Sequence, residues 1–453
     1  LQYMRILQLV PSLHVGGVER GVQEVDSALH HVGYGSYVAS AGGPLARRLS
    51  GCHLCGRTLS YRNPLCVLLL NPLLLAYWVR RHRISVLHAR SRCLAASALV
   101  ACLIAPGTKL VVTWHGFYSS GSLPRWLFNG LLLLADRLIL PSAFIRAHVR
   151  AQYVHATTGH WRMVHRGVAQ MKVAGRCANE TACPEKGLDE TAIVLLPGRL
   201  SASKGQDSFL AALQLLRERP PLISADGRVT EVVGRMVGAK ESCGGRYSAR
   251  VRAAVEEARR GGAKVSLEPH TAEIAQAYHD ARVVVVPSRR AEAFGRVLLE
   301  ALSASRLVVA FQHGAVGELA SLVWEEGRRT GADEGMGCGM LDDEGGSRDR
   351  LQDELLSWSH ARQVGTGVLL MGAVLLVGCG DVPGLANAIE AAATMPASER
   401  EWRTRRASAA ARKRFSLQAF TDRTLDVYRE VHAVAESAAP VRESATPVRV
   451  CAL

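Results

Sequence analysis

The chain has 453 residues, of which 48% are hydrophobic and 21% are charged, so it is long enough for about two or three globular domains. This composition excludes a chain that is disordered throughout, a collagen and a coiled coil. Lys and Arg outnumber Asp and Glu by 55 to 40, and residues 1–170 alone hold 18 basic and four acidic side chains. Such an excess favours anionic partners, among them phosphorylated substrates and acidic membrane faces.

The cysteines and the start of the sequence indicate a reducing compartment. The 11 cysteines are scattered, and the CxxC pair of Cys52 and Cys55 has no second pair at zinc spacing. We therefore expect free thiols, no bound metal and a cytoplasmic protein. No secretory signal peptide is recognised, because residues 4–10 already have the pattern of a strand.

An apolar run at residues 63–79 raises the question of a membrane. It contains Pro64, Asn71 and Pro72 and falls short of about 20 uninterrupted apolar residues. We expect a buried helix or an interfacial segment rather than a span, which allows a peripheral position on the inner face of a membrane. Residues 366–378 are too short to cross a bilayer.

Strand-like and helical patterns alternate along the first part of the chain. A helix is expected at residues 18–31, after a Gly-rich turn, and strands are expected at residues 5–10, 37–40, 85–89, 109–114 and 137–142. Strands that alternate with helices predict a parallel sheet covered on both faces.

A polar stretch at residues 171–190 is interpreted as a linker, and a second alternating block follows it. Strands are expected at residues 192–200, 230–236, 264–269, 281–288 and 307–311, and helices at residues 207–217, 296–303, 381–395 and 401–433. The charged, Gly-rich residues 321–364 are predicted to be a flexible insertion. The predicted units are therefore residues 1–170, a second domain at 191–415, a last helix at 416–435 and a disordered tail at 436–453.

Two cations lie on a loop at the end of a predicted strand in the second block. Arg199 follows the strand and Lys204 precedes a helix, within PGRLSASKG. A guanidinium fork and an ammonium at the carboxyl end of a strand can grip a diphosphate without a metal. The alternative is two solvated loop cations.

Two acids with the spacing E-x7-E follow the strand at residues 281–288. Glu292 lies in the loop and Glu300 in the next helix, and a helix that starts near Gly295 would point its N–H groups at an anion. The two carboxylates would then flank a bound diphosphate. The alternative is one capping acid and one solvated helix acid.

Two weaker features lie in the first block. Gly16 and Gly17 follow the first strand and allow a ligand to approach the backbone closely, although a lone GG turn is weak evidence. His115 follows the strand at residues 109–114, where it would be a polar contact or a general acid/base, or simply a structural histidine.

Together these features resemble the retaining GT-B glycosyltransferases of family 4, which use nucleotide-activated sugars. The resemblance is carried by GGVER, HARSR, TWHGFY, LPSAFIRAHV, HRGV, PGRLSASKG, PSRRAEAFGRVLLEAL and VVAFQHGAVGEL, over roughly residues 4–320. It implies an α/β fold of two Rossmann-like domains whose parallel sheets face each other across a cleft, with the last helix returning to the N-terminal domain. The HARSR and AEAFGR motifs are most similar to those of members that build lipopolysaccharide cores or related surface glycans.

The resemblance also implies roles for the site residues. Arg199 and Lys204 would bind the donor phosphates, Glu292 the transferred sugar and Glu300 the ribose. His115 would lie near the sugar, and the remaining donor contacts would be Gly16, Gly17, Phe294, Gly295 and Arg296. Where this family usually has Gly and Pro, the chain has Ser305 and Leu307. The alternative expectation is that these replacements and the insertion at residues 321–364 disturb the packing of the donor domain and hence activity.

Basic residues flank the apolar run at residues 63–79. They suit an anionic membrane leaflet or a phosphorylated glycolipid acceptor, with ordinary solvated helix faces as the alternative. These residues are Arg80, Arg81, Arg83, Arg90 and Arg92.

The function expected from the sequence is the retaining transfer of a hexose-type sugar from a nucleotide-diphosphate sugar to a glycolipid or surface glycan, with no cofactor and no metal. The alternatives are a decayed, non-catalytic scaffold or binding protein, and a nucleotide-sugar epimerase or hydrolase on the same fold. Nucleic acid is not an expected partner, because the chain has no zinc finger and no RNP-type aromatic cluster.

Overall fold

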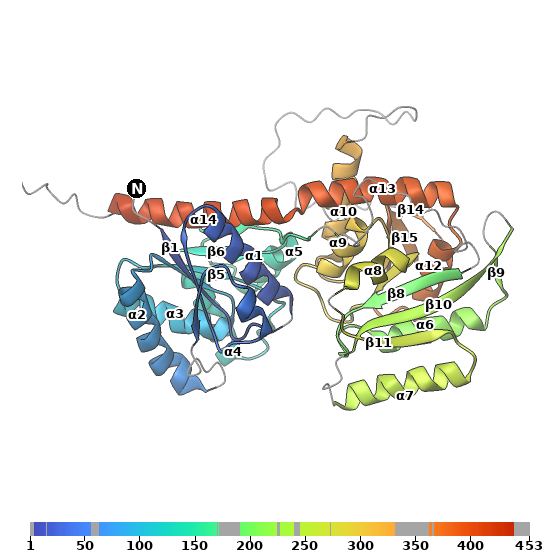
Figure 1. The fold of residues 1–453 in the computed structure, drawn as a ribbon, viewed down its shortest axis with the longest axis horizontal. Coiled ribbons are helices and arrows are strands. Elements are labelled where there is room, and N and C mark those ends of the chain that lie inside the picture. The colour runs from blue at the N-terminus through green and yellow to red at the C-terminus, as the bar shows by residue number, and fades with distance from the viewer. Residues whose placement is uncertain are drawn as a thin grey trace, which may run out of the picture.

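The computed structural model describes residues 4–14, 16–55, 63–169, 171, 191–223, 227–239, 245–271, 273–330, 362–364 and 367–438. These residues form two α/β domains, each built on its own sheet, and one pair of C-terminal helices runs along both (Figure 1).

The N-terminal domain is a sheet of seven parallel strands in the order β3-β2-β1-β4-β5-β6-β7. The central strands are apolar and buried on both faces, as parallel sheets require. The strands are β1 (Arg5–Leu9), β2 (Gly35–Ser40), β3 (Cys52–Cys55), β4 (Val86–Ala89), β5 (Lys109–Thr113), β6 (Arg137–Leu140) and β7 (Trp161–Met163). The helices are α1 (Gly17–His31), η1 (Pro44–Arg48), η2 (Cys66–Leu70), α2 (Asn71–His82), α3 (Arg92–Ile104), α4 (Leu123–Gly130), η3 (Leu131–Leu134) and α5 (Ala143–Gln152).

The second domain has the strand order β11-β10-β8-β12-β13-β16-β15-β14, and β9 pairs with β10. Its first six strands along this path, from β11 to β16, are parallel, whereas the pairs β16–β15 and β15–β14 are antiparallel. The strands are β8 (Thr191–Pro197), β9 (Leu222–Ile223), β10 (Val229–Ala239), β11 (Val265–Pro269), β12 (Val283–Val286), β13 (Leu307–Phe311), β14 (Arg362–Gln363), β15 (Val368–Met371) and β16 (Val374–Val377). The helices are α6 (Gln206–Arg217), α7 (Arg246–Arg260), α8 (Ile274–Asp280), α9 (Arg296–Ser303), α10 (Val316–Thr330), α12 (Val382–Ala393) and α13 (Ala397–Arg414).

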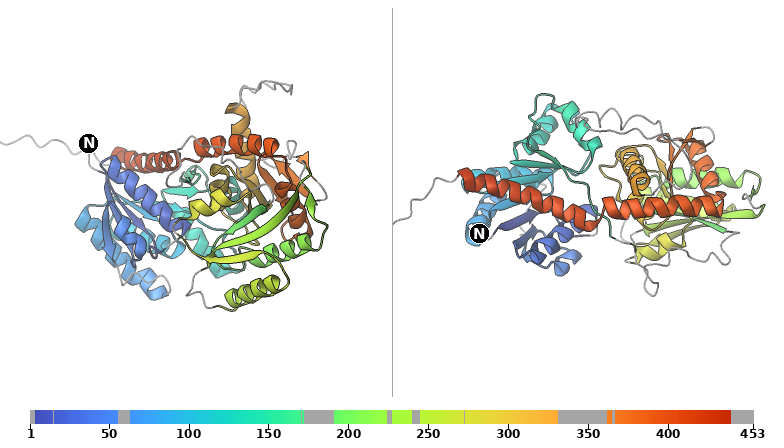
Figure 2. Two further views of the ribbon diagram at one scale, coloured as in Figure 1. Left: turned by 45° about the vertical axis from the view of Figure 1, so that its right-hand side comes forward. Right: turned by 90° about the horizontal axis from the view of Figure 1, so that it is seen from above.

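The helix α14 (Leu417–Ala438) follows α13 and packs on the N-terminal domain, as both views of Figure 2 show. Its apolar side chains complete a core with strands of the first sheet, where Tyr428 is fully buried and its hydroxyl lies 2.6 Å from His88 Nδ1. Glu430 pairs with Arg137 at 3.1 Å and with Arg162 at 2.8 Å. The chain therefore crosses between the domains twice.

Three predicted boundaries need correction or fall outside the described residues. Residues 321–330 are not a loop, because they continue the amphipathic helix α10, and residues 331–361 lie outside the described part. The predicted tail starts too early, since α14 runs to Ala438, and residues 439–453 are not described. Of the predicted linker at 171–190, only Met171 is described.

The two replacements near the E-x7-E helix fit the fold. Ser305 adopts a left-handed φ of 59°, a conformation that costs a non-glycine residue about 1 kcal/mol. Leu307 is fully buried at the start of β13. Leu307 is therefore part of the core of the second domain, and Ser305 is partly buried beside it.

Candidate active site between the two domains

The loop that holds Arg199 and Lys204 joins β8 to α6 and lies against the loop that follows β12. Gly205 has a φ of 70°, and a Cβ there would lie 2.0 Å from the carbonyl oxygen of Pro287. The backbone N–H of Arg289 donates to the carbonyl of Ser203 at 3.0 Å. The glycine therefore lets the two loops meet at the carboxyl edge of the sheet.

This contact brings Lys204 and Glu292 together. Lys204 Nζ donates to Glu292 Oε1 at 2.6 Å, and Ser288 Oγ donates to the same oxygen. Burial raises the pKa of the Glu292 carboxyl, but the charge and hydrogen bond of Lys204, together with Ser288, outweigh it and hold that pKa below its ordinary value. Glu292 is therefore an ionised, buried acceptor at neutral pH.

Gly314 holds the backbone of Glu292 in place, a role that the sequence analysis missed. Gly314 has a φ of 70°, and a Cβ on it would lie 2.5 Å from both the backbone nitrogen and the backbone oxygen of Glu292. The next residue, Ala315, donates its N–H to the Glu292 carbonyl at 3.0 Å. The glycine within QHGAVGEL, just after a buried strand, was the available signal.

The helix α9 begins directly after this acid. Phe294 is buried, and Gly295 takes a left-handed φ of 75° that turns the chain into the helix at Arg296. Glu300 lies one turn into α9 and accepts from the Tyr278 hydroxyl at 3.0 Å. Its other oxygen lies 3.8 Å from Arg20 of the N-terminal domain.

Arg199 does not join the Lys204–Glu292 pair directly. Its side chain is exposed, and its carbonyl accepts from the Gln206 side chain at 3.0 Å. The structure thus brings together Lys204, Glu292 and the start of α9, with Arg199 on the same loop as Lys204.

The glycines of the N-terminal turn face the second domain. Gly16 precedes α1 and Gly17 starts it, and a Cβ on Gly17 would lie 3.6 Å from Arg296 Cδ. The Arg296 guanidinium crosses to Glu24 of α1 at 3.3 Å. Arg166, which follows β7, donates to the Gly17 carbonyl.

His115 lies beyond the end of β5, at the same edge of the N-terminal sheet. Burial lowers its pKa well below the ordinary value, and the nearby cations Arg166 and Arg90 lower it further. Its Nε2 is buried and has no hydrogen-bond partner among the described residues. His115 is therefore neutral near pH 7, with one ring nitrogen left for a ligand.

The five predicted acceptor arginines do not form one surface. Arg80, Arg81 and Arg83 are exposed around the C-terminal end of α2, and Arg92 lies 4.3 Å from the ring centroid of Tyr118. Arg90 does not share this exposed surface, because its side chain is buried and donates to Gln8 Oε1 at 2.6 Å; its role at the acceptor stays a prediction. Arg90 lies instead behind the interdomain site.

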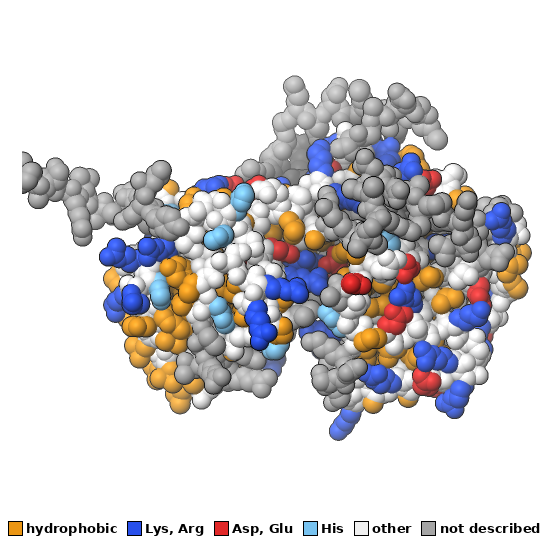
Figure 3. All heavy atoms as spheres, in the orientation of Figure 1, with side chains coloured by type: hydrophobic (Ala, Val, Ile, Leu, Met, Phe, Trp, Pro, Cys, Tyr) orange, Lys and Arg blue, Asp and Glu red, His pale blue; other side chains and the backbone are white. Residues whose placement is uncertain are grey.

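A carboxylate from the second domain caps a helix of the first. Glu318, on the first turn of α10, accepts from the backbone N–H groups of Ala143 and Phe144 at 2.8 and 2.9 Å. Ser142 Oγ also donates to the carbonyl of Ala293, next to Glu292, at 2.6 Å. On the face that Figure 3 shows, basic and acidic side chains gather between the two domains. Only tertiary structure could have identified the contacts of Glu318 and Ser142.

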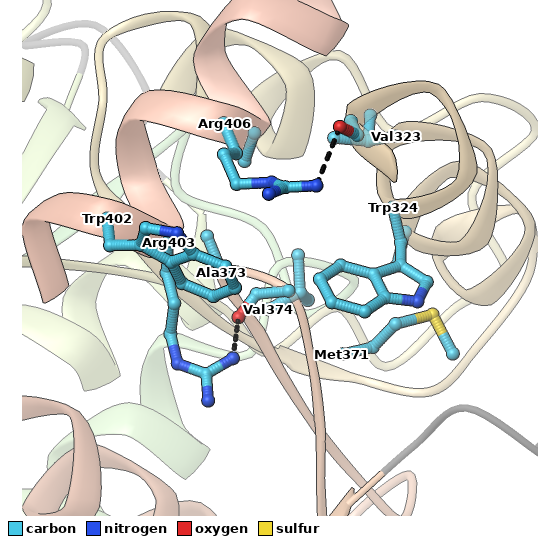
Figure 4. Close-up of a pocket in the computed structure, with 12 residues that line it drawn as sticks. Val323, Trp324, Met371, Ala373, Val374, Trp402, Arg403 and Arg406 are labelled. Atoms are coloured by element: carbon cyan, nitrogen blue, oxygen red, sulfur yellow. Dashed lines mark hydrogen bonds between the residues drawn. The ribbon is translucent and has the colours of Figure 1, made fainter. Parts of the chain in front are cut away.

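A separate hollow lies in the second domain, between α10, α13 and the β15–β16 turn. Trp324, Met371, Trp402, Arg403 and Arg406 line it (Figure 4). Its free volume of about 10 Å³ has room for about one water molecule, so it is not a substrate site.

Two family models match the chain, one on each domain. Residues 15–169 match the model described as Glycosyltransferase Family 4, and residues 180–322 match the model described as Glycosyl transferases group 1. Comparison with curated proteins gave no match.

Solved structures share the fold over almost the whole chain. A glycosyltransferase from Rickettsia africae is 20% identical with a TM-score of 0.70, covering 95% of this chain and 99% of that one. Anabaena HepE in complex with UDP and glucose is 17% identical with a TM-score of 0.66, covering 94% and 100%. The lipopolysaccharide outer core galactosyltransferase WaaB is 13% identical with a TM-score of 0.60, also covering 94% and 100%. The expected fold and enzyme class are thus confirmed: the chain is a glycosyltransferase with the GT-B fold.

Proposed function

We propose that the chain transfers a hexose-type sugar, with retention of anomeric configuration, from a nucleotide-diphosphate sugar to an anionic glycolipid or glycan. The observation that carries the proposal is the Lys204–Glu292 pair, which lies just before the N-terminus of α9 and close to the N-terminal domain. Glu292, which would accept hydrogen bonds from the sugar hydroxyls, then lies beside Lys204, which would bind the phosphate.

The chemistry needs charge stabilisation at the departing diphosphate. As the bond to the anomeric carbon breaks, negative charge builds on the phosphate, and Arg199, Lys204 and the N–H groups of Gly295 and Arg296 stabilise it. Glu292 accepts hydrogen bonds from the transferred sugar, and Glu300 from the ribose. The acceptor hydroxyl attacks from the face that the phosphate leaves, and that phosphate takes the proton. No metal and no cofactor are part of this proposal.

Several related structures support the nucleotide-sugar donor. Those of HepE contain UDP, UDP-glucose, or UDP and glucose, and WaaB is described as a lipopolysaccharide outer core galactosyltransferase. A lipopolysaccharide core is therefore the acceptor class that we propose first.

A thermal-shift screen with UDP, GDP, ADP and their sugars tests the donor site, because a ligand that binds the folded state raises its melting temperature. Product analysis with a labelled donor then separates the alternatives. Acceptor-dependent transfer supports the proposal, an acceptor-independent change of sugar indicates an epimerase, and absence of both turnover and nucleotide binding refutes it. Activity in excess EDTA tests metal independence, and the NMR coupling constant of the product tests retention.

We also propose that the N-terminal domain docks on the anionic inner leaflet of a membrane. Leu73 and Tyr77, each 59% exposed, line one hollow on α2 together with Arg80 and Arg81 of its basic end. Apolar side chains next to arginines suit an anionic interface. In the described part of the chain, every helix is too short or too polar to cross a bilayer.

Vesicle sedimentation at low salt tests this docking. The Arg80→Glu/Arg81→Glu variant should lose binding to anionic vesicles, whereas Arg252→Glu/Arg260→Glu, with the same change of charge on α7, should retain it. Equal recovery of the unaltered protein with anionic and neutral vesicles would refute the docking.

A further inference from the structure

Two arginines, of which Arg90 is buried and Arg166 is partly buried, meet at the first turns of α1, and neither is used in the proposed donor site. Arg90 follows β4, Arg166 follows β7, and both lie at the carboxyl edge of the N-terminal sheet. A Cβ on Gly21 would lie 2.6 Å from Arg166 Nη2 and 3.8 Å from Arg90 Nη1. The two guanidiniums therefore flank the same glycine.

The hydrogen bonds of Arg90 are incomplete. Arg90 is only 4% exposed and donates to Gln8, but its Nε has no partner among the described residues. In the same described region, His115 Nε2 and Glu24 Oε2 are also buried without a partner. A buried donor without a hydrogen bond costs roughly 1–3 kcal/mol, and an anion that accepts from Arg90 Nε can offset this cost.

The charges around α1 do not balance. The guanidiniums of Arg20, Arg90, Arg166 and Arg296 face the carboxylates of Glu19, Glu24 and Glu300. Burial lowers the pKa of Arg166 to about 9, and Arg296 and Arg90 contribute to the lowering. The N-terminus of the 15-residue helix α1 adds partial positive charge at the same place. The four guanidiniums therefore exceed the three carboxylates by one positive charge.

We propose that Arg90, Arg166 and the N-terminus of α1 bind a phosphate group carried by the acceptor. Each guanidinium can donate two parallel hydrogen bonds to phosphate oxygens. Two guanidiniums on either side of one site therefore suit a phosphate better than a single carboxylate. The inference rests on the proposed function, in which the donor phosphates belong to Arg199 and Lys204 of the second domain. Arg90 and Arg166 belong to the first domain, which the acceptor would occupy.

A titration of the full chain with inorganic phosphate, in which binding is measured as a thermal shift, tests the site. The unaltered protein should be stabilised, and Arg166→Gln should raise the apparent Kd for phosphate by about 10- to 100-fold. Arg150→Gln, the same substitution at an exposed site of α5, should leave the Kd unchanged. Lys204→Gln should weaken UDP binding but not phosphate binding. Glucose 6-phosphate should stabilise the protein more than glucose does.

The outcomes separate this site from the donor site. No stabilisation by phosphate, or a loss of it in Lys204→Gln but not in Arg166→Gln, overturns the inference. Failure of UDP to bind speaks against the proposed function, not against the phosphate site. Arg166→Lys and Arg90→Gln repeat the test if Arg166→Gln does not fold, and unchanged phosphate affinity in both also overturns the inference.

Discussion

Replacing Lys204 with alanine is expected to reduce turnover about 10²- to 10³-fold, the usual cost of one donor that stabilises transition-state charge. Lys204 Nζ lies 2.6 Å from Glu292 Oε1, and the two side chains are 25% and 16% exposed. At that separation the attraction is about 6 kcal/mol with an effective dielectric constant near 20, and desolvation cancels part of it. The variant therefore loses a phosphate contact and also leaves a buried carboxylate with only Ser288 as partner.

The loss of the partner of Glu292 should also change how activity depends on pH. Burial raises the pKa of Glu292, and in the native protein Lys204 and Ser288 bring it below the ordinary value. Without Lys204 the effect of burial dominates, so the acidic limb of the kcat/KM profile should move to higher pH. The native pair stabilises the fold above the pKa of the unfolded carboxyl, and this stability is lost as the pH falls through the lower folded pKa.

The assay measures steady-state transfer of a labelled sugar across pH, with Glu292→Gln as the matched control. Glu292→Gln lacks the titrating carboxyl and should lose that acidic limb. Near-normal turnover by Lys204→Ala, or an acidic limb at an unchanged pH in that variant, would refute the reasoning about this pair.

Three further substitutions have expected outcomes. Gly314→Ala should lower the free energy of unfolding by more than about 1 kcal/mol and impair transfer, measured by denaturant titration and turnover, because its Cβ meets the Glu292 backbone. Glu318→Gln should lower the free energy of unfolding by about 1–2 kcal/mol in the same denaturant titration, because it weakens the cap on α5. An unchanged free energy of unfolding would count against this cap. Tyr428→Phe should cost about 1 kcal/mol, since the hydroxyl contacts His88; a melting temperature within error of the native value would contradict this.

Local patterns predicted much of the fold. The helix at residues 296–303 has the observed bounds of α9, and the helix expected at 18–31 begins one residue earlier, at Gly17. Both are amphipathic and follow turn glycines, so short-range sequence was sufficient. The helix α10 was not predicted, and its residues from 321 onward were assigned to the insertion, because Glu325, Arg328 and Arg329 look like loop residues until their apolar neighbours are seen packed in the core.

The candidate site was predicted where motifs are contiguous and missed where it is assembled from distant segments. Lys204 and Glu292 each sit in a motif, and they meet as parallel-strand topology requires. Arg166 and Glu318 have no local pattern that identifies them. Their roles follow from which strand ends converge and how the domains lie against each other, and the separation of Arg90 from Arg80 and Arg81 has the same origin.

The crossing of α14 also bears on how the protein is made. His88 and Tyr428 are in contact although they lie 340 positions apart in the chain. The ribosome therefore delivers the whole first sheet long before the helix that seals one of its faces. Until that helix arrives, Ile6, Val86 and Val111 have an uncovered side, so the nascent domain is a natural client for a chaperone that shields apolar surfaces during synthesis.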